Sequence, residues 1–406
     1  MLLVQQKYRL SKMIFFSLFF SMVMLCDCQA RVGGNARSHR ACPKGYRSAY
    51  STPARRHRAL AQESIVSKAQ IHEQASSTNS ALTREDTFVT SEPGVQIFVR
   101  KVESSSNLDS GVPILLIHGG GPGSITSFDI DVPGYSVAAD LAAKGHRVYL
   151  MNVRGWERST RPVSFDEPPE ENPPAVTSEQ AVLDISAVVD WINQQNQSSK
   201  VALLGWATGG HWAGMYTSRN NDKISHLIML NSLYGVDAPW ELNKAFEDPN
   251  QPGQFDASSG AYRLANAKGL VAKWDETIPT TDKSQWREEA VARAYQQSAL
   301  ASDPTSNTRQ PPSLRIPAAY RQESYNLANG KKYWNARDIT VPTLVIRGER
   351  DFWSRPADMK ALEAELVNAP RVETETIPNG THYLFLDLPN RGRDRFIQEV
   401  VSFLEQ

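Results

Sequence analysis

Two side chains with complementary chemistry, the acid Asp351 and the base His382, follow a glycine-flanked segment, Gly205-Trp206-Ala207-Thr208-Gly209. In a catalytic triad the base takes a proton from a nucleophile, and the acid orients the base. The segment has the spacing of the G-x-S-x-G motif, in which the central serine is the nucleophile, but here the central residue is alanine. The sequence therefore predicts an acyl-transfer site in which Ala207 occupies the nucleophile position.

A glycine-rich run, His118-Gly119-Gly120-Gly121-Pro122-Gly123, could supply the second part of such a site. Small residues allow backbone N–H groups to face the negative oxygen that develops during acyl transfer. We expect the N–H groups of Gly119, Gly120 and Thr208 to be these oxyanion donors. Phosphate binding is not expected, because the run has neither the Lys-Ser/Thr ending nor the spacing of a dinucleotide-binding loop.

The alanine at position 207 leaves three interpretations open. Ala207 could stand in place of a nucleophilic serine in an inactive variant of a hydrolase. Alternatively, Asp351 and His382 could act directly as a general base on water or substrate, or the protein could bind a ligand without catalysis. Thr208 carries a hydroxyl, but the turn directs it elsewhere and we do not expect it to be the nucleophile. Glu349 is a second choice of acid, ranked lower because it lies nearer the end of its strand.

Alternating strands and helices must position these residues. Continuous apolar runs are typical of strands buried on both faces, and a capping box at Thr177 and Gln180 predicts the start of a helix. We expect a hairpin over 87–102 and strands near 112–117, 146–153, 200–205, 224–231, 343–346 and 372–377. We expect helices near 135–144, 177–197, 208–219 and 391–405. The predicted fold class is α/β, with a mostly parallel sheet flanked by helices.

The region 235–337 has a different texture from the rest of the chain. It is rich in tryptophan, tyrosine and phenylalanine, and prolines separate its helical stretches. Open α/β sheets bind ligands at the carboxyl ends of their strands. We therefore expect a helical cap at 235–337 that covers this edge of the sheet, with the core formed by 87–234 and 338–406.

These motifs together resemble the α/β-hydrolase superfamily over about residues 87 to 406. The resemblance is to the capped members with an HGG-type oxyanion loop, which include esterases, lactonases and proline iminopeptidase-like enzymes. It implies cleavage of an ester, lactone or amide bond in a small to medium substrate with an apolar or aromatic portion, and it implies no cofactor and no metal. The segment Asn152-Val153-Arg154-Gly155-Trp156-Glu157-Arg158-Ser159 resembles the D-x-R-G-x-G-x-S segment of these proteins, with Asn152 and Glu157 as departures.

The N-terminal part predicts export. Lys7, Arg9 and Lys12 precede the apolar run 13–25, and Cys28-Gln29-Ala30 forms a small-residue boundary. This order is that of a signal peptide over 1–30, and the run falls short of the roughly 20 residues that span a bilayer. Residues 31–86 are polar and basic, which predicts a partly disordered extension.

Overall composition narrows the class of partner. The chain has 44 lysines and arginines and 44 aspartates and glutamates, and its formal net charge is therefore zero. Neither this balance nor the distribution of basic residues suits a nucleic-acid partner. We expect a small-molecule substrate, no nucleic acid and no membrane span in the mature chain.

Overall fold

The computed structural model describes residues 82–105 and 112–406. The predicted signal peptide at 1–30 and most of the predicted extension at 31–86 lie outside the described residues. Within them, no helix combines the length and the apolar character that crossing a membrane would require.

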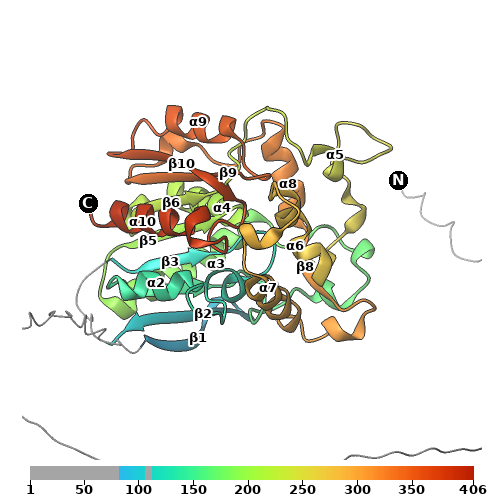
Figure 1. Cartoon of the computed structure of the whole chain (residues 1–406), viewed down its shortest axis with the longest axis horizontal. Helices are drawn as coiled ribbons and strands as arrows, with labels where there is room; N and C mark the ends of the chain where they lie inside the picture. Colours follow the sequence, from blue (N-terminus) through green and yellow to red (C-terminus); the bar gives the residue numbers. More distant parts are fainter. Residues whose placement is uncertain (1–81, 106–111) are drawn as a thin grey trace, which may run out of the picture. The chain divides into compact units, whose positions relative to one another are not determined.

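The described chain is built on an eight-stranded sheet with the order β1-β2-β4-β3-β5-β6-β9-β10 (Figure 1). The strands are β1 Leu82–Glu92, β2 Val95–Ser104, β3 Ile114–Ile117, β4 Val148–Met151, β5 Val201–Trp206, β6 Ile224–Leu230, β9 Thr343–Arg350 and β10 Val372–Thr381. β2 pairs antiparallel with β1 and β4, and all other pairings are parallel. Every residue of β3, β4 and β5 is buried, as expected for strands covered on both faces. The predicted fold class is confirmed.

The first strand begins five residues earlier than the boundary expected at residue 87, because residues 82–86 belong to β1 rather than to the extension. This part of β1 is polar and mostly exposed, which makes its sequence similar to that of a solvated tail. It pairs with β2 at the edge of the sheet, and Arg84 forms a 2.8 Å ion pair with Asp129. Charged side chains on an edge strand also discourage pairing with other chains.

Helices flank the sheet where the sequence predicts them. The helices of the core are α1 Ser124–Phe128, α2 Val137–Ala143, α3 Ser178–Asn196, α4 Thr208–Arg219, α9 Pro356–Glu365 and α10 Arg393–Leu404. The capping box of Thr177 and Gln180 is present at the start of α3. α2 and α10 contact each other, and α4 packs between α3 and β5. Two helices were not predicted from the sequence: the short helix α1, and α9, which begins at a proline.

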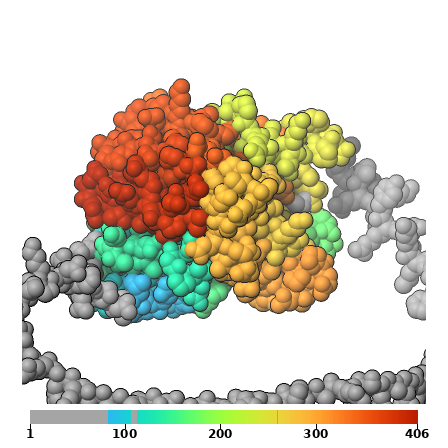
Figure 2. All heavy atoms as spheres, in the orientation of Figure 1, coloured from blue at the N-terminus to red at the C-terminus, as the bar shows by residue number. Residues whose placement is uncertain are grey.

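The cap at 235–337 is not purely helical. It contains α5 Asn243–Phe246, α6 Ala267–Thr277, α7 Glu289–Ala301 and α8 Ala319–Ala328, together with β7 Tyr262–Asn266 and β8 Ser313–Pro317. β7 and β8 form a separate two-stranded antiparallel sheet. Each has only five residues, too few for a period-two pattern to stand out against the surrounding helices. These elements gather beside one end of the main sheet, and in the space-filling view they form one continuous lobe (Figures 1 and 2).

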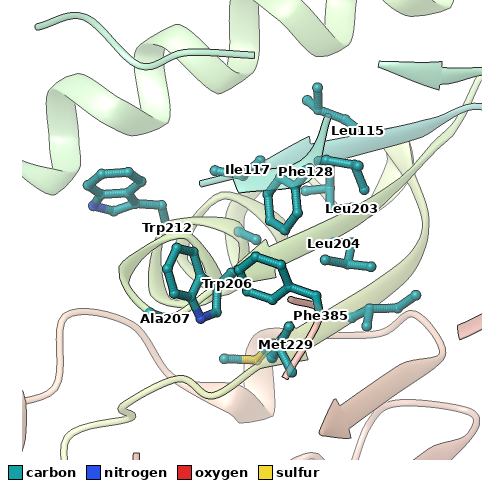
Figure 3. Packing of buried hydrophobic residues seen from close by; sticks show 14 of the residues in the cluster. Leu115, Ile117, Phe128, Leu203, Leu204, Trp206, Ala207, Trp212, Met229 and Phe385 are labelled. Atoms are coloured by element: carbon teal, nitrogen blue, oxygen red, sulfur yellow. The ribbon is translucent and has the colours of Figure 1, made fainter. Parts of the chain in front are cut away.

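The turn between β5 and α4 depends on the close approach of strand and helix. A Cβ atom added to Gly205 would lie 2.2 Å from the carbonyl oxygen of Gly209. A Cβ atom on Gly209 would lie 2.4 Å from the carbonyl oxygens of both Ile117 and His118. Figure 3 shows Ala207 at this turn, with Trp206 packed toward Phe385 and the core. Glycines at these positions are therefore a steric requirement of the turn.

Gly209→Ala is expected to lower the free energy of unfolding by about 2–3 kcal/mol, because the added Cβ meets backbone atoms that cannot move aside. Denaturation in urea measures the effect. Gly269→Ala in α6 is the matched control, since its new Cβ would have no neighbour closer than 3.5 Å. The control should be as stable as the parent or slightly more stable. Equal stability of the two variants would contradict this account of the turn.

Candidate active site

Ala207 lies at the apex of the turn between β5 and α4, with φ +53° and ψ −114°. A positive φ is uncommon for a residue other than glycine, and such strained conformations gather at functional sites. Its N–H donates a 2.7 Å hydrogen bond to the carbonyl oxygen of Leu230 at the end of β6, which holds the turn against the sheet. The backbone therefore keeps the geometry that would present a side chain at position 207 to the cavity described below.

His382 and Asp351 are brought together from the ends of β10 and β9. The Nδ1 atom of His382 lies 2.6 Å from Oδ1 of Asp351, and both side chains are buried. The Asp351 carboxylate also accepts hydrogen bonds from the backbone N–H groups of Trp353 (2.9 Å) and Ser354 (2.8 Å), and from the Ser354 hydroxyl. Glu349, the alternative acid, instead accepts a 2.8 Å bond from the N–H of Asn379. Asp351 is thus the acid that contacts the base.

Two residues that the sequence reading missed hold the segment that carries His382. The carbonyl oxygen of His382 accepts hydrogen bonds from Trp206 Nε1 (3.1 Å) and from Asn231 Nδ2 (3.0 Å). Asn231 also accepts a 2.8 Å bond from the N–H of Gly348, and it has a φ of +52°. The available signals were weak: Asn231 is a polar residue directly after a buried strand, and Trp206 lies within the glycine motif. Both residues tie the segment of the base to the ends of neighbouring strands.

The expected oxyanion donors surround Ala207. Among the described residues, no protein atom accepts a hydrogen bond from the N–H of Gly119, Gly120 or Thr208. All three residues line the same cavity as Ala207. The Thr208 hydroxyl is buried and has no hydrogen-bond partner in the described chain, so it is not bonded to His382 as a nucleophile would be. The arrangement leaves backbone donors available to an oxygen bound above Ala207.

His118 of the glycine-rich run is held in one neutral tautomer. Its Nε2 accepts a 3.1 Å hydrogen bond from the N–H of Val153, and its Nδ1 therefore carries the proton that is donated to the carbonyl oxygen of Gly119 (2.7 Å). Burial lowers the pKa of His118 to about 4. A neutral imidazole with a hydrogen bond at each ring nitrogen is suited to holding the loop in one conformation. It connects the residues that follow β3 with those that follow β4.

The two departures from the D-x-R-G-x-G-x-S pattern contact each other. Asn152 Nδ2 donates a 2.9 Å hydrogen bond to Glu157 Oε2, and Asn152 Oδ1 accepts from the N–H of Ser124 at 2.7 Å. Glu157 also accepts a 3.1 Å bond from the N–H of Thr126, so both side chains bind the first turn of α1. Burial raises the pKa of Glu157. The pair fixes the segment that follows the oxyanion loop, which accounts for the two unusual residues together.

A cavity of about 450 Å³ lies above Ala207 and beneath the cap. Its lower part contains Ala207, His382 and the three expected donors. The rest of the lining, largely aromatic or basic, comprises Gly121, Trp206, Leu242, Phe246, Arg263, Leu264, Gly269, Lys273, Tyr295, Tyr320, Arg321, Phe352, Trp353 and Tyr383. Such a volume is in the range of small-molecule sites. Five of the six predicted site residues therefore line one cavity: Gly119, Gly120, Ala207, Thr208 and His382. The sixth, Asp351, contacts His382 from outside the cavity lining.

A second buried histidine, His211, belongs to a polar network on the other side of α4. Trp334 Nε1 donates to His211 Nδ1, so His211 Nε2 carries the proton and donates to the Ser178 hydroxyl, each at 3.1 Å. The Ser178 hydroxyl and N–H in turn donate to Glu323 of α8 at 2.6 and 2.8 Å. Burial lowers the pKa of His211 to about 3 and raises that of Glu323 to about 7. The network joins the cap to the first turn of α3 and does not reach the cavity lining.

Glu323→Gln is expected to gain stability relative to the parent as pH rises. The carboxyl has a pKa of about 7 in the folded protein against an ordinary value of 4.5, so the folded state binds its proton more tightly. As pH rises from about 4.5 to about 7, the parent protein therefore loses the stability that the protonated carboxyl contributes. Glutamine does not titrate, so the stability of the variant does not fall in this way. Urea unfolding at about pH 5 and about pH 8 should show the difference between the proteins shift by about 1–3 kcal/mol in favour of the variant. A difference that does not change with pH would contradict the raised pKa.

A family model described as alpha/beta hydrolase fold matches residues 112–389. Among curated proteins, the chain is 24% identical over 263 residues to a 1-acylglycerol-3-phosphate O-acyltransferase of Saccharomyces cerevisiae, covering 60% of this chain and 65% of that protein. It is 22% identical to human lipase member M (72% and 75%) and 24% identical to epoxide hydrolase 3 of Xenopus tropicalis (62% and 63%). Two of these three relatives are thus matched over less than two thirds of their own length.

Solved structures share the fold at low sequence identity. A thioesterase domain from the curacin biosynthetic pathway has a TM-score of 0.50 with 17% identity, covering 80% of this chain and all of that domain. A hydrolase from Pseudomonas aeruginosa has a TM-score of 0.51 with 16% identity, covering 79% and 99%. A meta-cleavage product hydrolase from Pseudomonas fluorescens has a TM-score of 0.52 with 16% identity, covering 79% and 97%. At these identities the likeness concerns the fold alone.

Proposed function

The chain belongs to the α/β-hydrolase family, and from this premise we propose that its cavity binds a small to medium ester, lactone or amide with an apolar or aromatic portion. We further propose that the site cleaves such a substrate when a serine stands at position 207, and that the chain with Ala207 binds it without a covalent step. The observation that carries the proposal is that the His382–Asp351 pair and the strained turn at Ala207 serve one cavity.

The proposed chemistry assigns each group one role. With serine at position 207, His382 would take the hydroxyl proton as the oxygen attacks the acyl carbon, and Asp351 would hold the imidazole in the required tautomer. The N–H groups of Gly119, Gly120 and Thr208 would donate to the oxyanion of the tetrahedral intermediate. His382 would then give its proton to the leaving group, and a water molecule would release the acyl group by the same steps. With Ala207, the attacking oxygen is absent and this route stops at binding.

The relatives are consistent with acyl chemistry. Two of the three relatives, an O-acyltransferase and a lipase, are enzymes of acyl groups, whereas the third is an epoxide hydrolase. The aromatic lining supports a substrate with an apolar portion, because aromatic side chains bury large apolar areas. We therefore rank acyl transfer to water above the other reactions of this family.

A second candidate is general-base catalysis without a covalent intermediate. His382 keeps its acid partner and still lines the cavity although the chain carries no nucleophile at position 207. In this case the imidazole would activate a water molecule or abstract a substrate proton directly.

The two candidates are separated by assaying short p-nitrophenyl esters with the chain as it is and with Ala207→Ser. Turnover only in the serine variant supports the first proposal. Turnover in the alanine form that is abolished by His382→Ala supports the second. If neither folded protein turns over any ester, lactone or anilide tested, hydrolysis by either route is wrong, and ligand binding without hydrolysis becomes the favoured interpretation.

A further inference from the structure

We infer that the cap end of the cavity binds an anionic oxygen group of the ligand, held by Arg263 of β7 and Arg321 of α8. This deepens the proposed function, on which it rests, by naming a charged group that the substrate carries in addition to its apolar portion. The lining of the cavity is the starting point. Among its residues in the described chain are two arginines and one lysine, but no aspartate or glutamate.

Both arginines lack a carboxylate partner within the described residues. Arg263 Nε donates a 2.7 Å hydrogen bond to the Tyr320 hydroxyl. Arg321 Nη2 donates a 3.3 Å bond to the carbonyl oxygen of Ala245, and its guanidinium carbon lies 4.6 Å from the centre of the Phe246 ring. A guanidinium has five N–H donors, so most of the donors on each arginine remain for solvent or a ligand.

The lysine is different. Lys273 also lines the cavity, but its ammonium forms ion pairs with Glu276 at 2.6 Å and Glu241 at 3.4 Å. Two other buried arginines of the cap are also paired with carboxylates: Arg287 with Asp275 and Arg315 with Asp303, each at 2.8 Å. Among the partly buried arginines of the cap region 235–337, Arg263 and Arg321 are therefore the two without a carboxylate partner in the described chain.

The two guanidiniums also repel each other. Burial lowers the pKa of Arg321, Tyr320 raises it, the positive charge of Arg263 lowers it, and the negative charge of Asp256 raises it. Like charges held near each other in a partly desolvated wall are unfavourable unless an anion joins them. A carboxylate or phosphate would accept hydrogen bonds from both guanidiniums, for which their planar geometry is well suited.

The position of the arginines sets the shape of the ligand. Arg263 is bonded to Tyr320, whose ring contacts the oxyanion loop so closely that a Cβ on Gly120 would lie 2.3 Å from it. Tyr320 thus lies between Arg263 and the oxyanion loop. The substrate that fits carries an acyl group near Ala207, an apolar or aromatic middle, and an anionic group at the other end.

Binding to the chain with Ala207 tests this inference without any need for turnover. Isothermal titration is carried out with 4-phenylbutyrate, with 2-phenylethyl phosphate and with the neutral 4-phenylbutyramide. At least one anion is expected to bind about tenfold or more tightly than the amide, as hydrogen bonds to charged groups imply. Which anion gains more identifies the carboxylate or the phosphate as the group recognised. Equal binding of all three compounds overturns the inference.

Variants locate the anion. Arg263→Gln and Arg321→Gln should each remove most of the preference for the anion over the amide, whereas Arg293→Gln, on an exposed arginine of α7, should preserve it. A preference that survives in both cavity variants would mean that the oxyanion loop or His382 holds the anion, and the inference would be wrong. Circular dichroism confirms that each variant is folded. Ester turnover by Ala207→Ser tests the proposed function separately, so failure of either proposal can be recognised.

Discussion

Ala207→Ser is expected to raise kcat/KM for p-nitrophenyl butyrate by about 10⁴-fold or more over the chain as it is, because removing the nucleophile of a triad lowers kcat by about 10⁶-fold. The backbone at position 207 already has φ +53° and ψ −114°, so the new hydroxyl needs no rearrangement of the turn. His382 with its partner Asp351, and the three residues proposed as oxyanion donors, are also in place at the cavity. Only the attacking oxygen is added.

Two measurements check this result. Initial rates give kcat/KM, and intact mass after reaction with a fluorophosphonate shows whether one hydroxyl has become reactive. The matched control is Ala213→Ser, a buried alanine of α4, the helix that follows the turn, which does not line the cavity. It should remain inert to the ester and to the phosphonate. A folded Ala207→Ser protein that gains neither turnover nor labelling would refute the proposed role of position 207.

In the Ala207→Ser protein, Asp351→Asn is expected to lower kcat by about 10⁴-fold, because the amide favours the wrong tautomer of the base. The second oxygen of Asp351 accepts bonds from the N–H and hydroxyl of Ser354. An asparagine that kept an oxygen toward Ser354 would turn its NH₂ group toward His382 Nδ1. The imidazole would then carry its proton on Nε2, where it could not accept a proton from the serine.

The readout is kcat across pH, together with the melting temperature. His382→Ala should lose at least as much activity as Asp351→Asn, and combining the two changes should add little, because the residues act as a unit. Glu349→Gln is the matched control, since Glu349 bonds Asn379 and not the base. Its activity should stay close to that of the parent. A comparable loss in Glu349→Gln, or none in Asp351→Asn, would mean that the acid has been misassigned.

The sequence predicted those parts of the fold that are determined by interactions within a few neighbouring residues. The glycines of the turn at Ala207, the capping box at Thr177 and the buried strands each act over a few residues, and the structure has these elements where they were expected. The parts that were missed depend on pairing through space. Residues 82–86 of β1 are mostly polar and belong to a strand only because they pair with β2, and β7 becomes a strand only beside β8.

The candidate site divides in the same way. Asp351 and His382 each follow a predicted strand, in the chain order expected for the acid and the base. No local pattern, however, shows that Asn231 would bind the carbonyl oxygen of His382. Nor does the sequence show that Asn152 and Glu157 would contact each other, because each looks like an isolated departure from a motif. The sequence also could not predict that Arg263 and Arg321 lack carboxylate partners, because an unpaired arginine is recognised only when its neighbours in space are known.

The strained turn at Ala207 also has a consequence for the history of the gene. A positive φ at a non-glycine residue costs about 1–3 kcal/mol, and it persists here with an alanine side chain at the apex. Every alanine codon becomes a serine codon when its first base changes from G to U. Because the backbone at the turn already has this conformation, a single base change at this codon would place a hydroxyl in the cavity that His382 also lines. The chain is therefore one base change from carrying the proposed set of Ser, Asp and His.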